Sequence, residues 1–137
     1  MDLQLASDPL LPLEQIAVGG RFSVRGYREN RLVRDNGFIA SLEAGIPLIN
    51  NQWWADMVQV VPFVDFGTAW NTTIATPSPR TLASVGTGLR WALTIPRPIL
   101  WTPQFEIYWG LPLRHATTSG GDLQDMGLHL QFAVAAF

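Results

Sequence analysis

The sequence predicts an all-β fold, an antiparallel meander of about six strands. Three observations support this fold class. Apolar and polar residues alternate along five segments of about ten residues, as expected where successive side chains point to opposite faces of a sheet. Turn-rich stretches separate these segments. The best candidate for an amphipathic helix, residues 12–17, is short and is followed by Gly19 and Gly20.

The alternating segments define the expected strands. In the third segment, Val85, Leu89 and Trp91 fall on one face, and Gly86 and Arg90 fall on the other. The other segments show the same separation into an apolar face and a face of polar or small residues. We therefore expect strands at about 37–48, 57–69, 81–94, 102–113 and 125–136, with a further short strand at 2–7.

The composition limits the function classes. Hydrophobic residues make up 47% of the chain and charged residues only 15%, whereas a soluble domain carries about 25% charged residues. We therefore expect part of the surface to face something other than water. The formal net charge of -2 provides no basic stripe, so we expect no nucleic-acid partner. The absence of cysteine excludes a disulfide scaffold and a cysteine-ligated metal site.

The alternation alone fits two architectures equally well, a transmembrane β-barrel with a polar lumen and a soluble antiparallel β-sandwich. Three features favour the barrel. The polar faces combine small and charged residues, which suits a wet lumen, and the aromatic Phe137 directly follows the last strand. Aromatic residues also lie mostly near strand ends, where interfacial aromatic girdles sit. They are Trp53, Trp54, Trp70, Trp91, Trp101, Tyr108 and Trp109.

The connections between the strands alternate in length and character. Residues 8–36 form a long loop, and 70–80 and 114–124 are polar and turn-rich, whereas 49–56 and 95–101 are shorter. Outer-membrane barrels place their longer loops outside the cell and their shorter turns in the periplasm. We therefore expect the long loops to lie outside and the C-terminus to lie in the periplasm.

Two motifs carry a resemblance to a known family. The first, in the long loop, consists of Val24, Arg25, Gly26 and Tyr27. The second, in the strand at 57–69, includes Phe63, Asp65 and Gly67. Together with 86–91 and 123–132, they make the chain similar over essentially its whole length to two-partner-secretion transporters of the outer membrane, the haemolysin secretion/activation proteins. The resemblance implies that the chain is the C-terminal part of such a barrel.

The resemblance also implies a role for the two motifs. The long loop would fold back into the barrel, where Arg25 would pair with Asp65 of the wall and act as a latch. A guanidinium and a carboxylate form a charge-assisted and often bidentate hydrogen bond. Without the resemblance, the favoured interpretation of Arg25 is an exposed loop residue that contributes less than about 1 kcal/mol.

Six further polar residues are expected to line the lumen. They are Glu43, Gln59, Arg90, Glu106, His129 and Gln131. We interpret them as lumen structure, because the sequence has no nucleophile elbow, phosphate loop or metalloprotease motif. We therefore expect no enzyme activity, no cofactor and no metal site.

The function implied by the resemblance is export of a large partner exoprotein, such as a haemolysin or adhesin, across the bacterial outer membrane. The partners would be the secreted exoprotein, outer-membrane lipid and the barrel assembly machinery. One alternative is a related barrel with periplasmic POTRA domains that assembles outer-membrane proteins. The other alternative is a soluble β-sandwich that acts as a binding module.

Strand number leads us to expect a longer protein. About six strands are too few to close a transmembrane barrel, which needs about eight. The N-terminus also lacks the basic and apolar regions of a signal peptide, so we expect an export signal and further strands before residue 1. Phe137 falls out of phase with the lipid-facing residues of the last strand, and a β-bulge would explain the shift.

Overall fold

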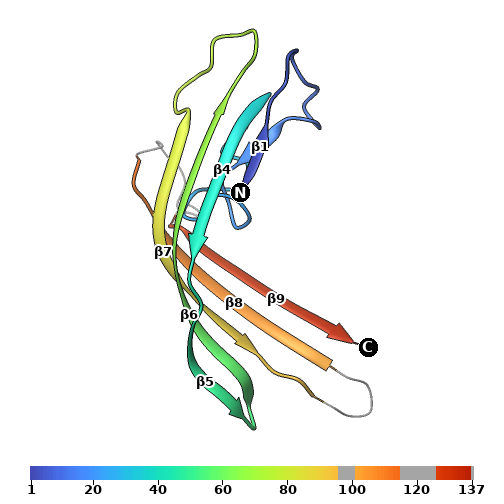
Figure 1. The fold of residues 1–137 in the computed structure, drawn as a ribbon, viewed down its shortest axis with the longest axis vertical. Helices are drawn as coiled ribbons and strands as arrows, with labels where there is room; N and C mark the ends of the chain where they lie inside the picture. The colour runs from blue at the N-terminus through green and yellow to red at the C-terminus, as the bar shows by residue number, and fades with distance from the viewer. Residues whose placement is uncertain (96–100, 115–125, 137) are drawn as a thin grey trace.

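The computed structural model describes residues 1–95, 101–114 and 126–136, and these form strands without a helix (Figure 1). The predicted all-β fold class is therefore confirmed. None of the described segments is a helix that could cross a membrane. The strands are β1 (Asp2–Gln4), β2 (Ile16–Val18), β3 (Leu32–Arg34), β4 (Asn36–Glu43), β5 (Ile46–Gln52), β6 (Ala55–Trp70), β7 (Thr81–Ala92), β8 (Trp101–Pro112) and β9 (Leu128–Ala136).

One large antiparallel sheet dominates the structure. Its strands follow the order β1-β4-β6-β7-β8-β9, and β5 pairs with β6. The sheet is curled like part of a barrel wall (Figure 1). β2 and β3 form a separate two-stranded hairpin, so the described residues do not build the two packed sheets that a soluble β-sandwich requires. β6 has 16 residues and β7 and β8 have 12 each, more than the roughly 9–11 that a tilted strand needs to span a membrane.

The two faces of the sheet differ in polarity. The inner face carries Phe63 and Asp65 of β6, which are 2% and 0% exposed, and the outer face carries Val64 and Phe66, which are 52% and 40% exposed. Such a continuous exposed apolar surface is expected where a sheet faces lipid. The large exposed apolar residues of the outer face are Leu42, Val64, Phe66, Val85, Leu89, Trp109, Leu111, Leu130, Phe132 and Val134.

The single strand predicted at 37–48 is wrong in detail. The structure divides it into β4 and β5, which pair with β6 on either side of a break opposite Pro62. The N–H of Ala44 donates to the carbonyl oxygen of Pro62 at 3.2 Å. Proline has no N–H with which to return this hydrogen bond, so the ladder is interrupted at 44–45.

The connection predicted at 49–56 is also wrong. β5 continues to Gln52, which pairs with Ala55 of β6, so only Trp53 and Trp54 form the turn. The polar residues before this turn resemble a loop in the sequence, although they belong to a strand. Trp53 is 91% exposed at the tip of the hairpin, at an end of the sheet where an interfacial aromatic residue is expected.

The long loop spans 5–35, between β1 and β4, rather than 8–36, and it contains the β2–β3 hairpin. The loop packs on the inner face through a shared hydrophobic core. Full burial of a valine or leucine side chain contributes about 1.5–3 kcal/mol. Apolar packing therefore stabilises the position of the loop on the sheet, in addition to the ion pairs described below. The core consists of Val18, Val24, Tyr27 and Leu32 of the loop with Ile39, Ala69 and Leu82 of the sheet.

Three segments, 96–100, 115–125 and 137, lie outside the described residues. The connections predicted at 95–101 and 114–124 and the terminal Phe137 fall wholly or largely on them. The strand predicted at 125–136 corresponds to β9, which begins at Leu128.

Candidate functional site

The inner face beneath the loop is organised in cross-strand rows. Register aligns Gln59 with Arg90, Arg90 with Glu106, and Glu106 with Gln131. Four of the six polar residues predicted to line the lumen therefore form one row across β6, β7, β8 and β9. The neighbouring rows are Val61, Gly88, Tyr108 and His129; then Glu43, Phe63, Gly86 and Gly110; then Ser41, Asp65 and Ser84.

Glycines let the loop approach the backbone of the sheet. A Cβ built on Gly110 would lie 2.6 Å from the backbone nitrogen of Gly26, and one built on Gly67 would lie 2.4 Å from Cγ1 of Val18. Gly26 has a φ of 95°, a conformation that favours glycine. Its N–H donates to Nε2 of His129 at 3.2 Å. Both sequence motifs thus place a glycine where the loop and the wall are closest.

Arg25 and Asp65 form the centre of the site. Nε and Nη2 of Arg25 donate to Oδ2 and Oδ1 of Asp65 at 2.8 and 2.9 Å, and the backbone N–H of Arg25 donates to Oδ2 at 3.0 Å. The two residues are only 3% and 0% exposed. Buried charges are tolerated where they are paired and hydrogen-bonded, so each residue stabilises the position of the other.

The other donors of Arg25 bind β4. Nη1 donates to Oε2 of Glu43 at 2.8 Å, and Nη2 donates to Oγ of Ser41 at 3.0 Å. The hydroxyl of Ser41 donates to Oδ1 of Asp65 at 2.5 Å. The guanidinium carbon of Arg25 lies 3.7 Å from the centroid of the Phe63 ring, in a cation–π contact. The guanidinium therefore has partners on two strands, β4 and β6.

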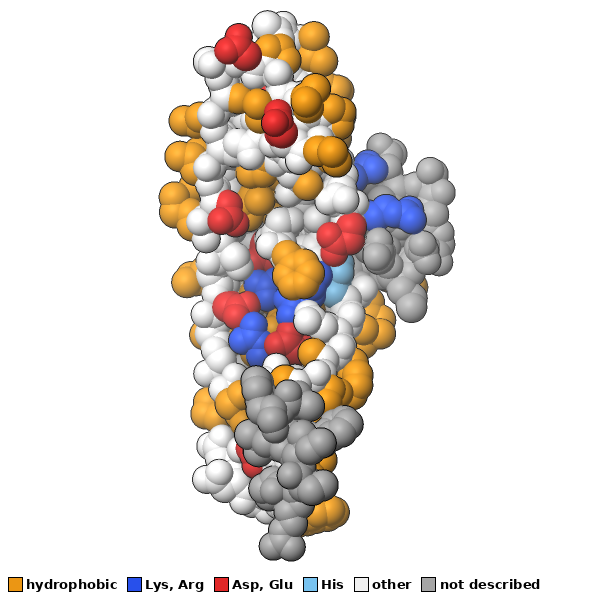
Figure 2. All heavy atoms as spheres, turned by 90° about the vertical axis from the view of Figure 1, so that its right-hand side faces the viewer, with side chains coloured by type: hydrophobic (Ala, Val, Ile, Leu, Met, Phe, Trp, Pro, Cys, Tyr) orange, Lys and Arg blue, Asp and Glu red, His pale blue; other side chains and the backbone are white. Residues whose placement is uncertain are grey.

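A second loop arginine, Arg21, also contacts the wall, through an ion pair with Glu106. Glu106 pairs with Arg90 at 3.4 Å, and Arg90 pairs with Glu43 at 2.6 Å. Because Glu43 also binds Arg25, ion pairs connect the two loop arginines across the wall. Figure 2 shows acidic and basic side chains gathered near the middle of this side of the molecule.

Tyr27 completes the loop motif. Its hydroxyl lies 2.9 and 3.0 Å from the carbonyl oxygens of Ala83 and Arg114, and it accepts a hydrogen bond from the N–H of Arg114 at 3.1 Å. The ring itself lies in the core between loop and sheet. The motif therefore binds β7 and the end of β8 through Tyr27, and β6 through Arg25.

Asp35 is a contact residue for which the sequence analysis predicted no role. The N–H of Thr72 donates to Oδ2 at 2.9 Å, and Gln15 Nε2 and the N–H of Leu10 donate to Oδ1 at 2.9 and 3.0 Å. These hydrogen bonds favour the charged carboxylate and lower the pKa of Asp35. Asp35 thereby joins the two ends of the long loop to the β6–β7 connection. The sequence feature that could have indicated this role is the position of Asp35 at the end of the long loop, directly before β4.

Tyr108 is a second correction. It was predicted among the aromatic residues near strand ends, whereas it is fully buried on the inner face, in the middle of β8. Its ring lies 6.0 Å from that of Phe63, and the guanidinium carbons of Arg21 and Arg25 lie 4.2 and 5.0 Å from its centroid. The alternation along this strand predicts that Tyr108 shares a face with Glu106, and the structure confirms that placement.

The arrangement is one of charge pairing and packing. Within the part of the chain that the structure describes, no group of three or more His, Cys, Asp or Glu side chains is arranged to hold a metal ion. The site joins a long loop to the inner wall of a curled sheet whose outer face is apolar. The fold and the site thus define a β-barrel wall of the outer-membrane type with an inward-folded loop.

Comparison with protein families agrees with this class. The model of the Omp85 superfamily domain matches residues 2–100, and the chain belongs to the Omp85 superfamily. Members of this superfamily are outer-membrane β-barrel proteins, which act on secreted or assembled substrate proteins. Searches of curated proteins and of solved structures found no match.

Proposed function

We propose that this chain is part of a two-partner-secretion transporter, which exports a large exoprotein of the haemolysin or adhesin type. The observation that carries the proposal is the long loop held on the inner wall by Arg25 and Asp65. In a closed barrel the loop would occupy the lumen, where its position would determine the space open to a passing chain. The choice of export over other superfamily activities rests on the resemblance of the two motifs.

The proposed mechanism needs no covalent chemistry. The inner face offers paired charges and small residues, and the outer face offers apolar residues to lipid. The exported chain would pass along the inner face, with the loop as a fixed guide. We propose that the turn at Trp53 and the C-terminus lie on the periplasmic side, and that the long loop enters from the outside.

Barrel-protein assembly is the second candidate, because superfamily members act on assembled as well as secreted substrates. Deletion of the gene would separate the two functions. Export predicts that one large protein disappears from the culture medium while the outer-membrane protein profile stays unchanged. Assembly predicts a general fall in outer-membrane barrel proteins.

Complementation then tests the site. The protein is expressed at the full length of its gene, as wild type or as Asp65→Asn, with Asp56→Asn on the same strand as the control. Export through the latched loop predicts that wild type and Asp56→Asn restore the secreted protein and that Asp65→Asn does not, although it reaches the outer membrane. Full secretion by Asp65→Asn would contradict the proposal.

A further inference from the structure

Phe22 stands out among the loop residues because it is 82% exposed on the inner side of the sheet. Its neighbours Val24 and Tyr27 are buried in the core, and Arg25 is buried against Asp65. A single exposed apolar residue is common on protein surfaces. Phe22 differs because it adjoins a hollow that also includes Arg21 and Arg90, and because hydrogen bonds fix the backbone that supports it.

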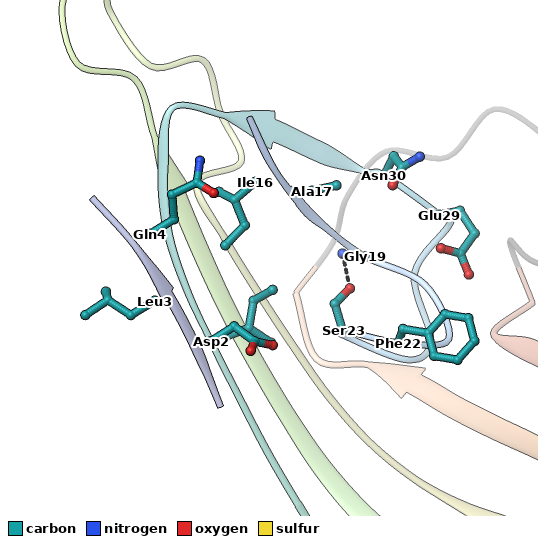
Figure 3. Close-up of a pocket in the computed structure, with 11 residues that line it drawn as sticks. Asp2, Leu3, Gln4, Ile16, Ala17, Gly19, Phe22, Ser23, Glu29 and Asn30 are labelled. Atoms are coloured by element: carbon teal, nitrogen blue, oxygen red, sulfur yellow. Dashed lines mark hydrogen bonds between the residues drawn. The ribbon is translucent and has the colours of Figure 1, made fainter. Parts of the chain in front are cut away.

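The backbone around Phe22 is fixed by hydrogen bonds. The N–H of Ser23 donates to the Gly20 carbonyl oxygen at 3.3 Å, and the N–H of Gly20 donates to the Val24 carbonyl oxygen at 3.1 Å. The N–H of Gly19 donates to Oγ of Ser23 at 2.8 Å (Figure 3). These bonds close a tight turn with Phe22 near its tip, so the ring is presented to the inner space.

Arg21 holds the same turn from the side. Its guanidinium pairs with Glu106, and its carbon lies 4.2 Å from the Tyr108 ring centroid and 5.5 Å from that of Phe22. The N–H of Arg21 donates to Oε1 of Glu29 at 2.8 Å. The backbone around Phe22 and the side chain of Arg21 are therefore anchored, and the Phe22 ring projects from this fixed turn.

Phe22 also lies at the meeting point of three hollows of the inner side. The first lies between the loop and β1 and includes Gln4 and Glu29 (Figure 3). The second includes His129 and Gln131 of β9, and the third includes Arg90 of β7. A chain that passes along the inner face through any of these hollows would meet the Phe22 ring.

We propose that Phe22 is the contact at which the loop binds the exported polypeptide, and that it binds apolar side chains of an unfolded chain. The inference rests on the proposed export function. Arg21 is paired with Glu106 and Arg90 is paired with Glu43, so these four groups favour neither sign of charge in the substrate. The aromatic ring then supplies the attraction, and it does so for many sequences, because any apolar side chain can pack against it.

Photo-crosslinking tests the contact directly. The protein is expressed at the full length of its gene with benzoylphenylalanine in place of Phe22 and is reconstituted in phosphatidylcholine vesicles. The probe is a biotinylated 30-residue peptide of Ser, Thr and Gln with Leu at every fifth position, compared with a peptide that has Ser at those positions. The control places the crosslinker at Leu13, which is 100% exposed in the same loop and does not line the three hollows.

The expected result is an adduct at position 22 with the leucine peptide, at least about threefold stronger than with the serine peptide, and no such preference at position 13. In cells, Phe22→Ala should lower secretion by about three- to tenfold, whereas Phe22→Leu and Leu13→Ala should secrete normally. Equal adducts with both peptides, or normal secretion by Phe22→Ala, would overturn the inference.

The outcomes separate this inference from the proposed function. If wild type exports a protein and Phe22→Ala does so equally well, the export function stands and the Phe22 contact is wrong. If deletion of the gene removes no secreted protein, the proposed function is wrong, and with it the assignment of the peptide contact to export.

Discussion

Arg25 of the long loop and Asp65 of β6 are joined by three hydrogen bonds of 2.8 to 3.0 Å, two from the guanidinium and one from the backbone N–H. Forty residues separate them in the sequence, and neither is exposed to more than 3%. Because the backbone N–H of Arg25 also binds the carboxylate of Asp65, the main chain of the loop is held at this point in addition to the side chain. The pair therefore fixes both the position and the conformation of the loop.

Removal of one partner of this pair should release the loop. Asp65→Ala leaves the Arg25 guanidinium buried with Glu43 as its remaining carboxylate partner, and breaking a buried pair costs about 3–5 kcal/mol. The rate of protease cleavage within residues 18–30 of the full-length protein measures the release. We expect cleavage to rise by at least about tenfold, since 1.4 kcal/mol corresponds to a factor of ten. Unchanged cleavage would show that the core alone holds the loop.

Gly67→Ala should displace the loop by steric conflict. A Cβ at this position would lie 2.4 Å from Cγ1 of Val18 and 2.8 Å from Cγ2 of Val24. Overpacking of this kind costs about 1–3 kcal/mol. Gly45→Ala is the matched control, because its nearest neighbour, 3.0 Å away, is the flexible end of Gln59. Thermal unfolding of the two variants checks the difference, and an equal effect of both substitutions would argue against close packing at Gly67.

The ion pair between Arg21 and Glu106 should contribute less to the free energy of unfolding than the buried pair of Arg25 and Asp65. The side chains of Arg21 and Glu106 are 16% and 22% exposed, and Nε of Arg21 is buried without a hydrogen-bond partner. We expect Arg21→Ala to cost about 1 kcal/mol, near the upper end for exposed pairs. A double-mutant cycle with Glu106→Ala in urea unfolding measures the coupling. A loss in unfolding free energy as large as that of Arg25→Ala would contradict this ranking of the two arginines.

The contacts of Asp35 should weaken in acid. Its pKa is lowered from the ordinary value of 3.8 by hydrogen bonds from Thr72, Gln15 and Leu10. The folded state therefore binds the proton less readily than the unfolded state, and the stabilisation is complete above about pH 4 and lost as the pH falls through the lowered pKa. The protection factors of residues 5–15, which are corrected for the intrinsic pH dependence of amide exchange, should fall between pH 6 and pH 3 in wild type. In Asp35→Asn the protection factors of the same segment should change less with pH.

The sequence predicted the faces of the sheet well, because side-chain parity is a local property. Phe63, Asp65, Glu106 and His129 lie on the inner face, as alternation required. The break opposite Pro62 could not be predicted, since it depends on which residue of another strand meets the missing N–H. Strand ends were misplaced at Trp53 for a related reason, because polar residues before the turn still pair with β6.

The site was predictable only in part. The Arg25–Asp65 pair followed from the resemblance and not from spacing. The roles of Arg21 and Tyr108 depend on register across β7, β8 and β9, which brings Glu106 beside Arg90 and Tyr108 beside His129. Register depends on the hydrophobic pattern together with turn geometry and loop length, and the strand ends and connections were not predicted closely enough to define it.

Amide hydrogen exchange across residues 18–27 tests the central claim most directly, namely that the Arg25–Asp65 pair fixes the loop on the inner wall. The full-length protein in lipid nanodiscs is compared with Asp65→Asn and with the control Asp56→Asn. We predict slow exchange of this segment in wild type and Asp56→Asn, and at least about tenfold faster exchange in Asp65→Asn. Fast exchange in wild type, or equal protection in all three proteins, would contradict the account.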